Sequence, residues 1–416
     1  MLRTMSRFAM RTPEALAALR HRDFRTFWLG TCVSFVGSWV QTVAVGLYVY
    51  DRTGSKQALG LVGLASGLPT AALLLFGGVV ADRLDKRRVL YVTQSLFALT
   101  AFTLAVLTAR NAATVSHVMA LSFVNGLIFA IDGPTRQSLV YDLVGPEDLA
   151  TGVALQSASF NIARIIGPAI ASMIYVGLGP AWCFATNGLS FAAVLFALTR
   201  IRVASSQSHE RPPAPGAALR ASFDYLRSNP SARTILALTA VASVFGVANY
   251  GTLMPAVARD SLGIMEGDSR YGFLFSAIGF GSLVGVYLVG AHSAHRRRGA
   301  LVCGGALVFS GALMALAQTT QFWVALAVMF VIGMSAVSQL ATANTLTQTL
   351  APDGLRGRAV SLHMFAMGGL QPLGAAIAGA VAQSYGVTSA LTVGSIVLFV
   401  AAMAVLLARR DISKLP

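Results

Sequence analysis

The fold of this chain is decided by the stretch Gly78-Val79-Val80-Ala81-Asp82-Arg83-Leu84-Asp85-Lys86-Arg87-Arg88. An apolar run at 58–81 leads into this stretch and another at 89–109 follows it, and each is long enough, at about 20 residues, to cross a bilayer. The charges therefore lie in a hairpin that is too short to hold a domain. Basic residues in such a hairpin predict a cytoplasmic loop, with a role in membrane topology alone as the alternative to a functional role.

The composition is that of a protein that crosses the membrane many times. Of its 416 residues, 55% are hydrophobic and only 11% are charged, and the mean hydropathy is +0.68. A net charge of +15 would also suit a nucleic-acid-binding protein. However, the basic residues are scattered over the short loops of one membrane side and over both termini, not gathered on one folded face. This distribution predicts cytoplasmic termini and no nucleic-acid partner.

Apolar segments predict twelve membrane spans in two sets of six, at about 27–50, 58–81, 89–109, 115–140, 150–177 and 180–199, then 233–258, 271–291, 300–318, 322–347, 359–383 and 387–408. The two halves show internal similarity, because 60–90 aligns with 272–302 and 146–149 with 352–355. The sequence thus predicts an all-α membrane protein of two pseudo-symmetric six-helix bundles. The expected parts are a cytoplasmic segment 1–26, a bundle 27–200, a polar linker 201–232, a second bundle 233–408 and a cytoplasmic tail 409–416.

Several short motifs occur at the expected loops and spans: Gly78-x-x-x-Asp-Arg-x-x-x-Arg-Arg88, Arg22-Asp-Phe-Arg25, Tyr50-Asp-Arg-Thr-Gly-Ser55, Pro134-Thr-Arg-Gln137, Asn161-Ile-Ala-Arg-Ile-Ile-Gly-Pro168 and Arg356-Gly-Arg358. With them the chain resembles transporters of the major facilitator superfamily, and within it the drug:proton antiporter, enterobactin exporter-like (transmembrane secretion effector) family. The resemblance implies the major facilitator fold, alternating access, and a location in the bacterial inner membrane. The substrates of this family are unrelated compounds, so the resemblance leaves the substrate open.

In the superfamily that this chain resembles, the hairpin between the second and third spans gates alternating access. The resemblance therefore implies gating roles for Gly78, Asp82, Arg83, Asp85, Lys86, Arg87 and Arg88. Asp85 departs from the pattern, because the superfamily usually has a second Gly at this position.

Arg164 is the basic residue that the sequence places inside a span, and Asp132 is the one carboxylate in the inner part of a span. An Arg at a helix centre costs about 2.5 to 3.5 kcal/mol on insertion scales, so it should face protein or water. One interpretation pairs Asp132 with Arg164, with Asp132 as a protonation site for proton coupling. The alternative is that Arg164 only ties its span to backbone carbonyls near Pro134.

The resemblance also implies a bend and a cavity. Gly167 and Pro168 resemble the end of the antiporter motif in span five, and Pro372 resembles a duplicate bend in span eleven. In the superfamily, spans one, four, seven and ten line the substrate cavity. Their polar and aromatic candidates in this chain are Trp39, Gln41, Asn125, Asn249, Tyr250 and Gln339. Taken singly, each is more often a helix–helix hydrogen-bonding residue than a ligand contact.

The sequence has no metal-ligand spacing, no phosphate-binding Gly loop and no nucleophile with a base, so we expect neither an enzyme nor a metal or cofactor. Its three cysteines lie in apolar spans and predict no disulfide. We expect a monomer in the bilayer that uses the proton gradient to export a bulky amphipathic small molecule such as a siderophore, drug or secondary metabolite. The alternatives are an uncoupled facilitator or importer of a small neutral solute, and a membrane sensor or assembly partner that transports nothing.

Overall fold

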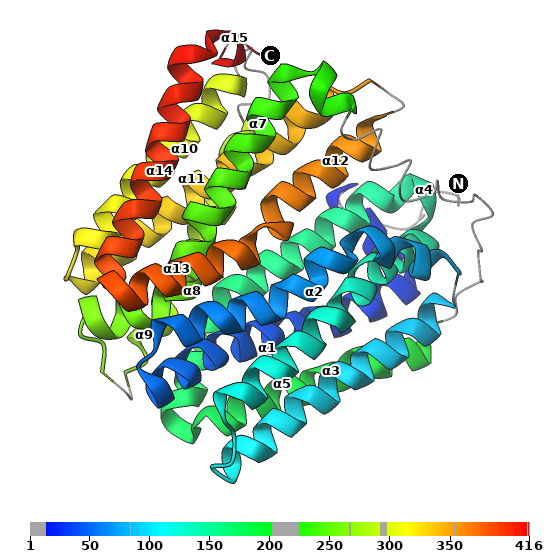
Figure 1. The fold of residues 1–416 in the computed structure, drawn as a ribbon. Helices are drawn as coiled ribbons and strands as arrows, with labels where there is room; N and C mark the ends of the chain where they lie inside the picture. The colour runs from blue at the N-terminus through cyan, green and yellow to red at the C-terminus, as the bar shows by residue number, and fades with distance from the viewer. Residues whose placement is uncertain are drawn as a thin grey trace, which may run out of the picture.

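The structure, a computed structural model, describes residues 14–83, 85–201, 224–265, 268–291, 298–352, 355–413 and 415, with the backbone alone at 14–15, 74–83, 291, 410 and 413. Within these residues every regular element is a helix, as expected for an all-α membrane protein. Figure 1 shows the helices of the first half, which are blue to green, gathered apart from most of those of the second half, which run from the bright green α7 to the red α14.

The first half contains η1 (Glu14–Arg20), α1 (Arg22–Thr53), α2 (Lys56–Arg83), α3 (Lys86–Ala109), α4 (Val115–Leu178) and α5 (Pro180–Arg200). Helix α4, with 64 residues, is two helices joined at Gly145, where φ is 73°. Only Gly adopts this angle at little cost, so Gly145 lets the chain turn between two spans. The two parts of α4 match the spans expected at 115–140 and 150–177.

In the second half, one continuous rod is built from α7 (Pro230–Val241), η2 (Ala242–Val247), α8 (Ala248–Ala256) and η3 (Val257–Ser261). The rods α9 (Arg270–Ala291), α10 (Arg298–Gln318) and α11 (Phe322–Thr349) follow. Another rod is interrupted, and consists of α12 (Arg356–Met364), η5 (Phe365–Gly369) and α13 (Gln371–Tyr385). The described chain closes with α14 (Val387–Ala408) and the short α15 (Arg410–Ser413).

Ten helices of the described residues are long and apolar enough to cross a membrane by length and composition. That number counts α4 once, although it holds two spans, and it leaves out α2, whose 28 residues exceed the length of a bilayer crossing. With these two additions the described helices accommodate the twelve spans that the sequence predicts.

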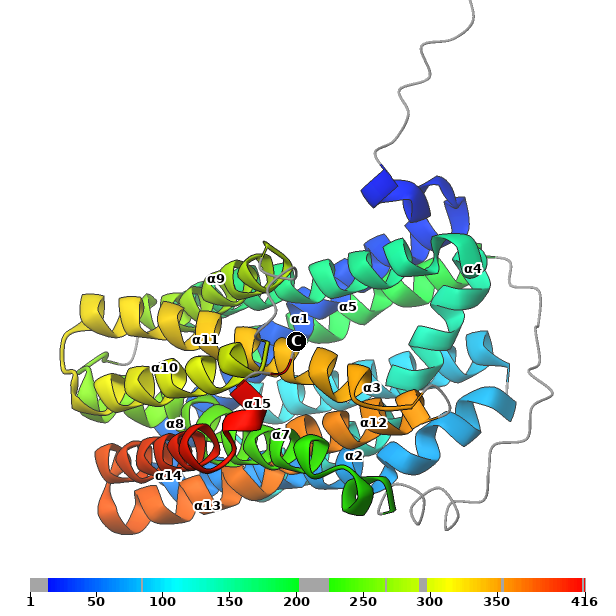
Figure 2. The ribbon, with the colours of Figure 1, turned by 90° about the horizontal axis from the view of Figure 1, so that it is seen from above.

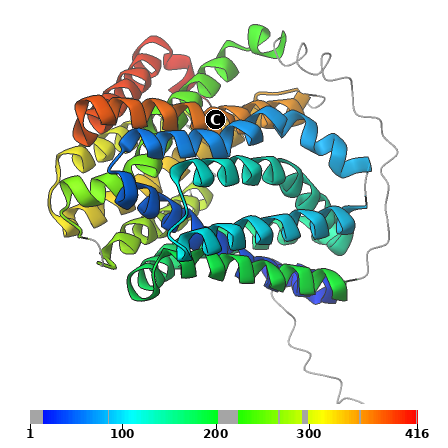
Figure 3. The ribbon, with the colours of Figure 1, turned by 60° about the horizontal axis from the view of Figure 1, so that its bottom comes forward.

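Within each half the helices pack as a bundle. In the first, α1 packs on α4 and α5, α3 on α5, and α2 on α4; in the second, α11 lies between α9 and α10, and α10 packs on α14. The bundles meet along two seams, α2 with α13 and α4 with α9. Figure 3 shows the first seam, where the orange α13 runs beside the blue α2, and Figure 2 shows α9 beside α4.

The seam between α2 and α13 depends on glycine. A Cβ atom on Gly60 would lie 2.6 Å from the carbonyl oxygen of Ala375 and 3.0 Å from Cα of Gly379, so the backbones could not approach as they do. We therefore expect Gly60→Val to destabilise the protein by about 2 kcal/mol, as overpacking does. A lower midpoint of thermal unfolding in mild detergent would show this. Gly304→Val is the control, since a Cβ there meets nothing within 4 Å, and equal midpoints for the two variants would contradict the prediction.

Candidate functional site

Asp132 is the centre of a buried polar network in the first bundle, with only 3% of its surface exposed. Its Oδ1 accepts hydrogen bonds from the Thr93 hydroxyl and the Gln94 amide, both at 2.7 Å. Its Oδ2 accepts from Nε and an Nη of Arg136, at 3.3 and 2.9 Å. Arg136 also donates to the Thr31 hydroxyl at 3.2 Å, so the network joins α1, α3 and α4.

The partner of Asp132 is therefore Arg136, and the structure does not bring Asp132 and Arg164 together. Arg136 lies four residues after Asp132 on the same helix, a spacing that places two side chains on one face. The sequence analysis named Arg164 as the basic residue inside a span and overlooked Arg136, although position 136 lies near the end of the span expected at 115–140. The helical spacing was the signal that could have found it.

The guanidinium of Arg136 lies among aromatic rings as well as polar groups. It is 5.5 Å from the ring centroid of Phe35 and 6.0 Å from that of Phe27. A desolvated guanidinium over a ring face gains cation–π attraction. Arg136 is therefore held both by its carboxylate and by α1.

Arg164 lies instead where the two bundles meet. It is partly exposed and interacts electrostatically with Tyr250 of α8. The Ser276 hydroxyl of α9 donates to the backbone carbonyl of Ile165 at 2.6 Å. A Cβ on Gly279 of α9 would lie 3.2 Å from the backbone carbon of Arg164, so α9 closely approaches this turn.

Two residues expected to line the cavity are hydrogen-bonded between neighbouring helices. The Gln41 carbonyl of α1 accepts from the Asn187 amide of α5 at 2.8 Å. The Asn125 carbonyl of α4 accepts from the Thr100 hydroxyl of α3 at 2.7 Å. Both residues thus form hydrogen bonds between helices, which was the alternative to a ligand contact in the sequence analysis.

Asn249 and Gln339 also lie between helices. The Asn249 amide donates to the carbonyl of Ala390 on α14 at 3.4 Å and to the carbonyl of Phe245 at 2.7 Å. Gln339 has no exposed surface and packs against Gly305 of α10. Neither atom of its amide group has a partner among the described residues. The contacts of Asn249 favour a packing role over a ligand contact.

Trp39 and Tyr250 remain as cavity candidates. The Trp39 ring lies 5.8 Å from that of Phe160, and its Cβ lies against Gly167. The Tyr250 ring contacts Phe309 edge-on at 6.2 Å. Trp39 thus lies beside the part of α4 that carries Arg164, and Tyr250 faces Arg164 from the other bundle.

The expected bends lie at the two seams between the bundles. Pro168 is within α4, where non-helical backbone angles occur only at Gly145, and a Cβ on Gly272 of α9 would collide with its carbonyl. Pro372 stands in the first turn of α13, where the rod is interrupted, and a Cβ on Gly67 of α2 would collide with its ring. Each proline is therefore in close contact with a glycine of the other half.

The predicted gating hairpin is anchored to its own bundle. Asp85 begins α3 by accepting a hydrogen bond from the Arg88 backbone at 2.9 Å. Lys86 forms an ion pair with Asp142 of α4 at 2.7 Å, and Arg87 donates to the carbonyl of Leu198 at 2.7 Å. Of Gly78, Asp82 and Arg83 the structure describes only the backbone, as part of α2.

A charged cluster lies at the end of the molecule opposite the predicted gating hairpin, near the turns at Gly54, Gly179, Gly263 and Gly386. The sequence analysis missed this cluster. We call this end of the molecule the Gly54 end. The Arg259 guanidinium there binds both carboxylate oxygens of Asp51, at distances from 2.8 to 3.1 Å. The Tyr175 hydroxyl donates to the same carboxylate at 3.0 Å.

A second ion pair reinforces this cluster. Lys56 pairs with Asp260 at 2.8 Å, and the Tyr50 hydroxyl donates to Asp260 at 2.7 Å. Gln383 of α13 accepts a hydrogen bond from the Lys56 backbone at 2.9 Å. Both ion pairs that join the bundles within the described residues lie at this end. The signal available in the sequence was the opposite charge at the edges of spans one and seven.

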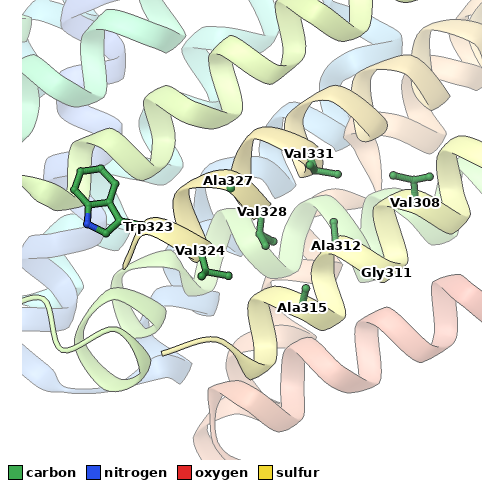
Figure 4. Close-up of a pocket in the computed structure, with 9 residues that line it drawn as sticks. All are labelled: Val308, Gly311, Ala312, Ala315, Trp323, Val324, Ala327, Val328 and Val331. Atoms are coloured by element: carbon green, nitrogen blue, oxygen red, sulfur yellow. The ribbon is translucent and has the colours of Figure 1, made fainter. Parts of the chain in front are cut away.

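An apolar groove of about 630 Å³ lies on the second bundle. Figure 4 shows its lining, which comes from α10 and α11: Val308, Gly311, Ala312, Ala315, Trp323, Val324, Ala327, Val328 and Val331. Apart from the indole N–H of Trp323, that lining has no polar side-chain group, so the groove offers little to orient a polar ligand.

A family model described as transmembrane secretion effector matches residues 13–414. The staphyloferrin A transporter of Staphylococcus aureus is 26% identical over 56% of this chain and 58% of its own length, so the match spans just over half of that protein. The multidrug efflux pump Tap of Mycolicibacterium fortuitum is 24% identical over 84% of this chain and 87% of that protein. The enterobactin exporter EntS of Salmonella typhi is 25% identical over 81% of this chain and 80% of that protein.

Solved structures with the same fold are also transporters. A bacterial homologue of the human lysosomal transporter Spinster, in an inward-facing and occupied conformation, has a TM-score of 0.75 and 14% identity and covers 94% of this chain and 97% of its own. The peptide transporter POT in complex with sulfate has a TM-score of 0.77 and 12% identity over 94% of this chain and 95% of its own. The family model covers nearly the whole sequence, so the chain belongs to the transmembrane secretion effector family of the major facilitator superfamily and is a secondary transporter.

Proposed function

We propose that this transporter exports a bulky amphipathic small molecule, such as a siderophore, a drug or a secondary metabolite, in exchange for protons. It would work as a monomer in the bacterial inner membrane with both termini cytoplasmic, and with the proton gradient as its energy source in place of a cofactor. The named activities of its relatives, which include a siderophore exporter and a multidrug efflux pump, support export.

The position of the ion pairs between the bundles supports alternating access. The distribution of basic residues supports an orientation with the Gly54 end outside the cell. In that orientation, Asp51–Arg259 and Lys56–Asp260 would close the outer side in the described conformation. A substrate would then enter from the cytoplasm, which is the direction that an exporter needs.

The observation that carries proton coupling is the buried Asp132 carboxylate beside Arg136. Protonation of Asp132 would remove the negative charge that holds the guanidinium of Arg136. Arg136 could then form hydrogen bonds with other groups. Because Thr93, Gln94 and Thr31 belong to the same network, that change would reach α3 and α1. A single proton would thus alter the packing of three helices of the first bundle.

Transport in everted membrane vesicles tests this proposal. We expect uptake of at least one compound from a panel of a macrolide, a catecholate siderophore and a carboxylate siderophore when the vesicle lumen is acidic. Nigericin, which collapses the pH gradient, should reduce this uptake at least tenfold. Uptake that nigericin leaves unchanged would refute coupling, and uptake only into right-side-out vesicles would refute export.

A further inference from the structure

Arg164 carries a positive charge near the middle of the helix between Gly145 and Leu178. A charged side chain at this depth normally has a partner of opposite charge. In the part of the chain that the structure describes, four carboxylates in and beside the spans form ion pairs with other basic residues: Asp132–Arg136, Asp142–Lys86, Asp51–Arg259 and Asp260–Lys56. None of these four carboxylates is paired with Arg164.

Tyr250, which comes from the other bundle, lies near enough to Arg164 for the two side chains to interact electrostatically. Tyr250 is buried, and its ring is fixed by edge-on contact with Phe309. A guanidinium donates two parallel hydrogen bonds to a carboxylate, and a phenol hydroxyl donates one more. Together these two side chains offer several hydrogen-bond donors to a single anionic group.

Aromatic surface lies next to this pair of donors. Phe160 precedes Arg164 by one helical turn, and its ring lies 5.6 Å from Phe35 and 5.8 Å from Trp39. Phe160 is 44% exposed, and Phe35 and Trp39 are partly exposed. The rings therefore present a surface on which a flat apolar group could pack beside the guanidinium.

The backbone that carries Arg164 is held in place. The Ser276 hydroxyl donates to the Ile165 carbonyl, and Gly279 permits the close approach of α9 at the same turn. A binding group on a rigid helix is placed more accurately than one on a loop.

We propose that Arg164 and Tyr250 bind the acidic group, a carboxylate or phenolate, of an aromatic amphipathic substrate. This inference rests on the proposed function for the existence of a transported substrate and adds its chemical class. Because the two residues belong to different bundles, the bound anion joins the bundles, and its binding depends on their relative position. The anion also supplies the counter-charge that the four paired carboxylates do not.

A pair of probes that differ only in charge tests the inference. Binding of 2-naphthoate and of the neutral 2-naphthamide would be measured by isothermal titration to the purified protein in lipid nanodiscs, with the heat from empty nanodiscs subtracted. We expect the wild type to bind the acid at least tenfold more tightly than the amide. Arg164→Gln should remove this preference by weakening the acid alone, and Arg164→Lys should keep part of it.

Two further variants separate binding from folding. Tyr250→Phe keeps the ring contact with Phe309 and should weaken the acid by less than Arg164→Gln does, while Arg270→Gln, which removes an exposed charge paired with Asp268, should match the wild type. A wild type without preference for the acid, or an Arg164→Gln variant that loses both probes equally, would overturn the inference. Since no pH gradient is present, a failure of proton coupling in vesicles does not affect this result.

Discussion

Asp132→Asn is expected to abolish transport driven by a pH gradient, with a loss of at least tenfold, while exchange of substrate down its own gradient continues. The amide cannot gain or lose the proton, yet it has nearly the shape of the acid and can still accept from Thr93 and Gln94. The measurement is uptake into everted vesicles with and without an acidic lumen, normalised to the amount of protein in the membrane. Full gradient-driven uptake in this variant would mean that the proton binds at another residue.

Asp142→Asn is the matched control for this variant. Asp142 lies on the same helix, is buried to the same extent as Asp132, and forms a similar ion pair with Lys86. Its partner, however, begins α3 in the predicted gating hairpin and has no contact with the Asp132 network among the interactions of the described residues. We therefore expect Asp142→Asn to keep its response to the pH gradient, even if its maximal rate falls.

Removing Asp132 also leaves the Arg136 guanidinium with less compensation in a buried position. Breaking a buried pair by removing one partner costs about 3 to 5 kcal/mol, so the variant should unfold at a lower temperature than the wild type. Asp132→Asn with Arg136→Gln removes both charges and should recover part of the stability without recovering coupling. If coupling returned together with stability, Asp132 would be a structural residue.

The sequence predicted the helices well because membrane spans follow from length and apolar composition alone. The span boundaries at 89–109 and 387–408 are those of α3 and α14 to within a few residues. The kink at Gly145 was expected as a loop between two spans. Such predictions need no knowledge of which helices touch.

The candidate site was harder to predict because it depends on partners that are distant in sequence. Asp132 was correctly singled out as a buried carboxylate, but the pairing with Arg164 is not formed, since Arg136 lies one turn away. From the sequence alone, Gln41 and Asn125 look like cavity residues. Only the packing of the helices shows that they are hydrogen-bonded to Asn187 and Thr100. A hydrogen bond between helices and a ligand contact use the same side chains.

Arg259→Gln is expected to open the Gly54 end. The Arg259–Asp51 pair is bidentate and largely shielded from water, and it joins α1 to the first rod of the second bundle. Hydrogen bonds of this charged kind contribute about 2 kcal/mol, which corresponds to a change of at least tenfold in the ratio of closed to open molecules. The variant should therefore spend more time open at the Gly54 end and transport more slowly.

A cysteine at position 172 would report this opening. Ser172 is buried and lines a small pocket directly behind the pair, with Tyr175 and Arg259. In a protein whose three native cysteines have been replaced by Ser, Ser172→Cys should react slowly with a membrane-impermeant maleimide added from the Gly54 side. Arg259→Gln should raise the labelling rate at least tenfold.

Arg270→Gln provides the comparison, because Arg270 lies at the same end but pairs with Asp268 inside its own bundle. Exposed ion pairs of this kind contribute about 0 to 1 kcal/mol to stability. Breaking the Arg270–Asp268 pair leaves the two bundles joined, so the labelling rate should stay within twofold of the wild type. Exchanging the charges in Asp51→Arg with Arg259→Asp should restore slow labelling in part, because Tyr175 and the Ile264 carbonyl suit the native arrangement better. Equal labelling of Arg259→Gln and the wild type would mean that the apolar seams, and not this ion pair, hold the Gly54 end closed.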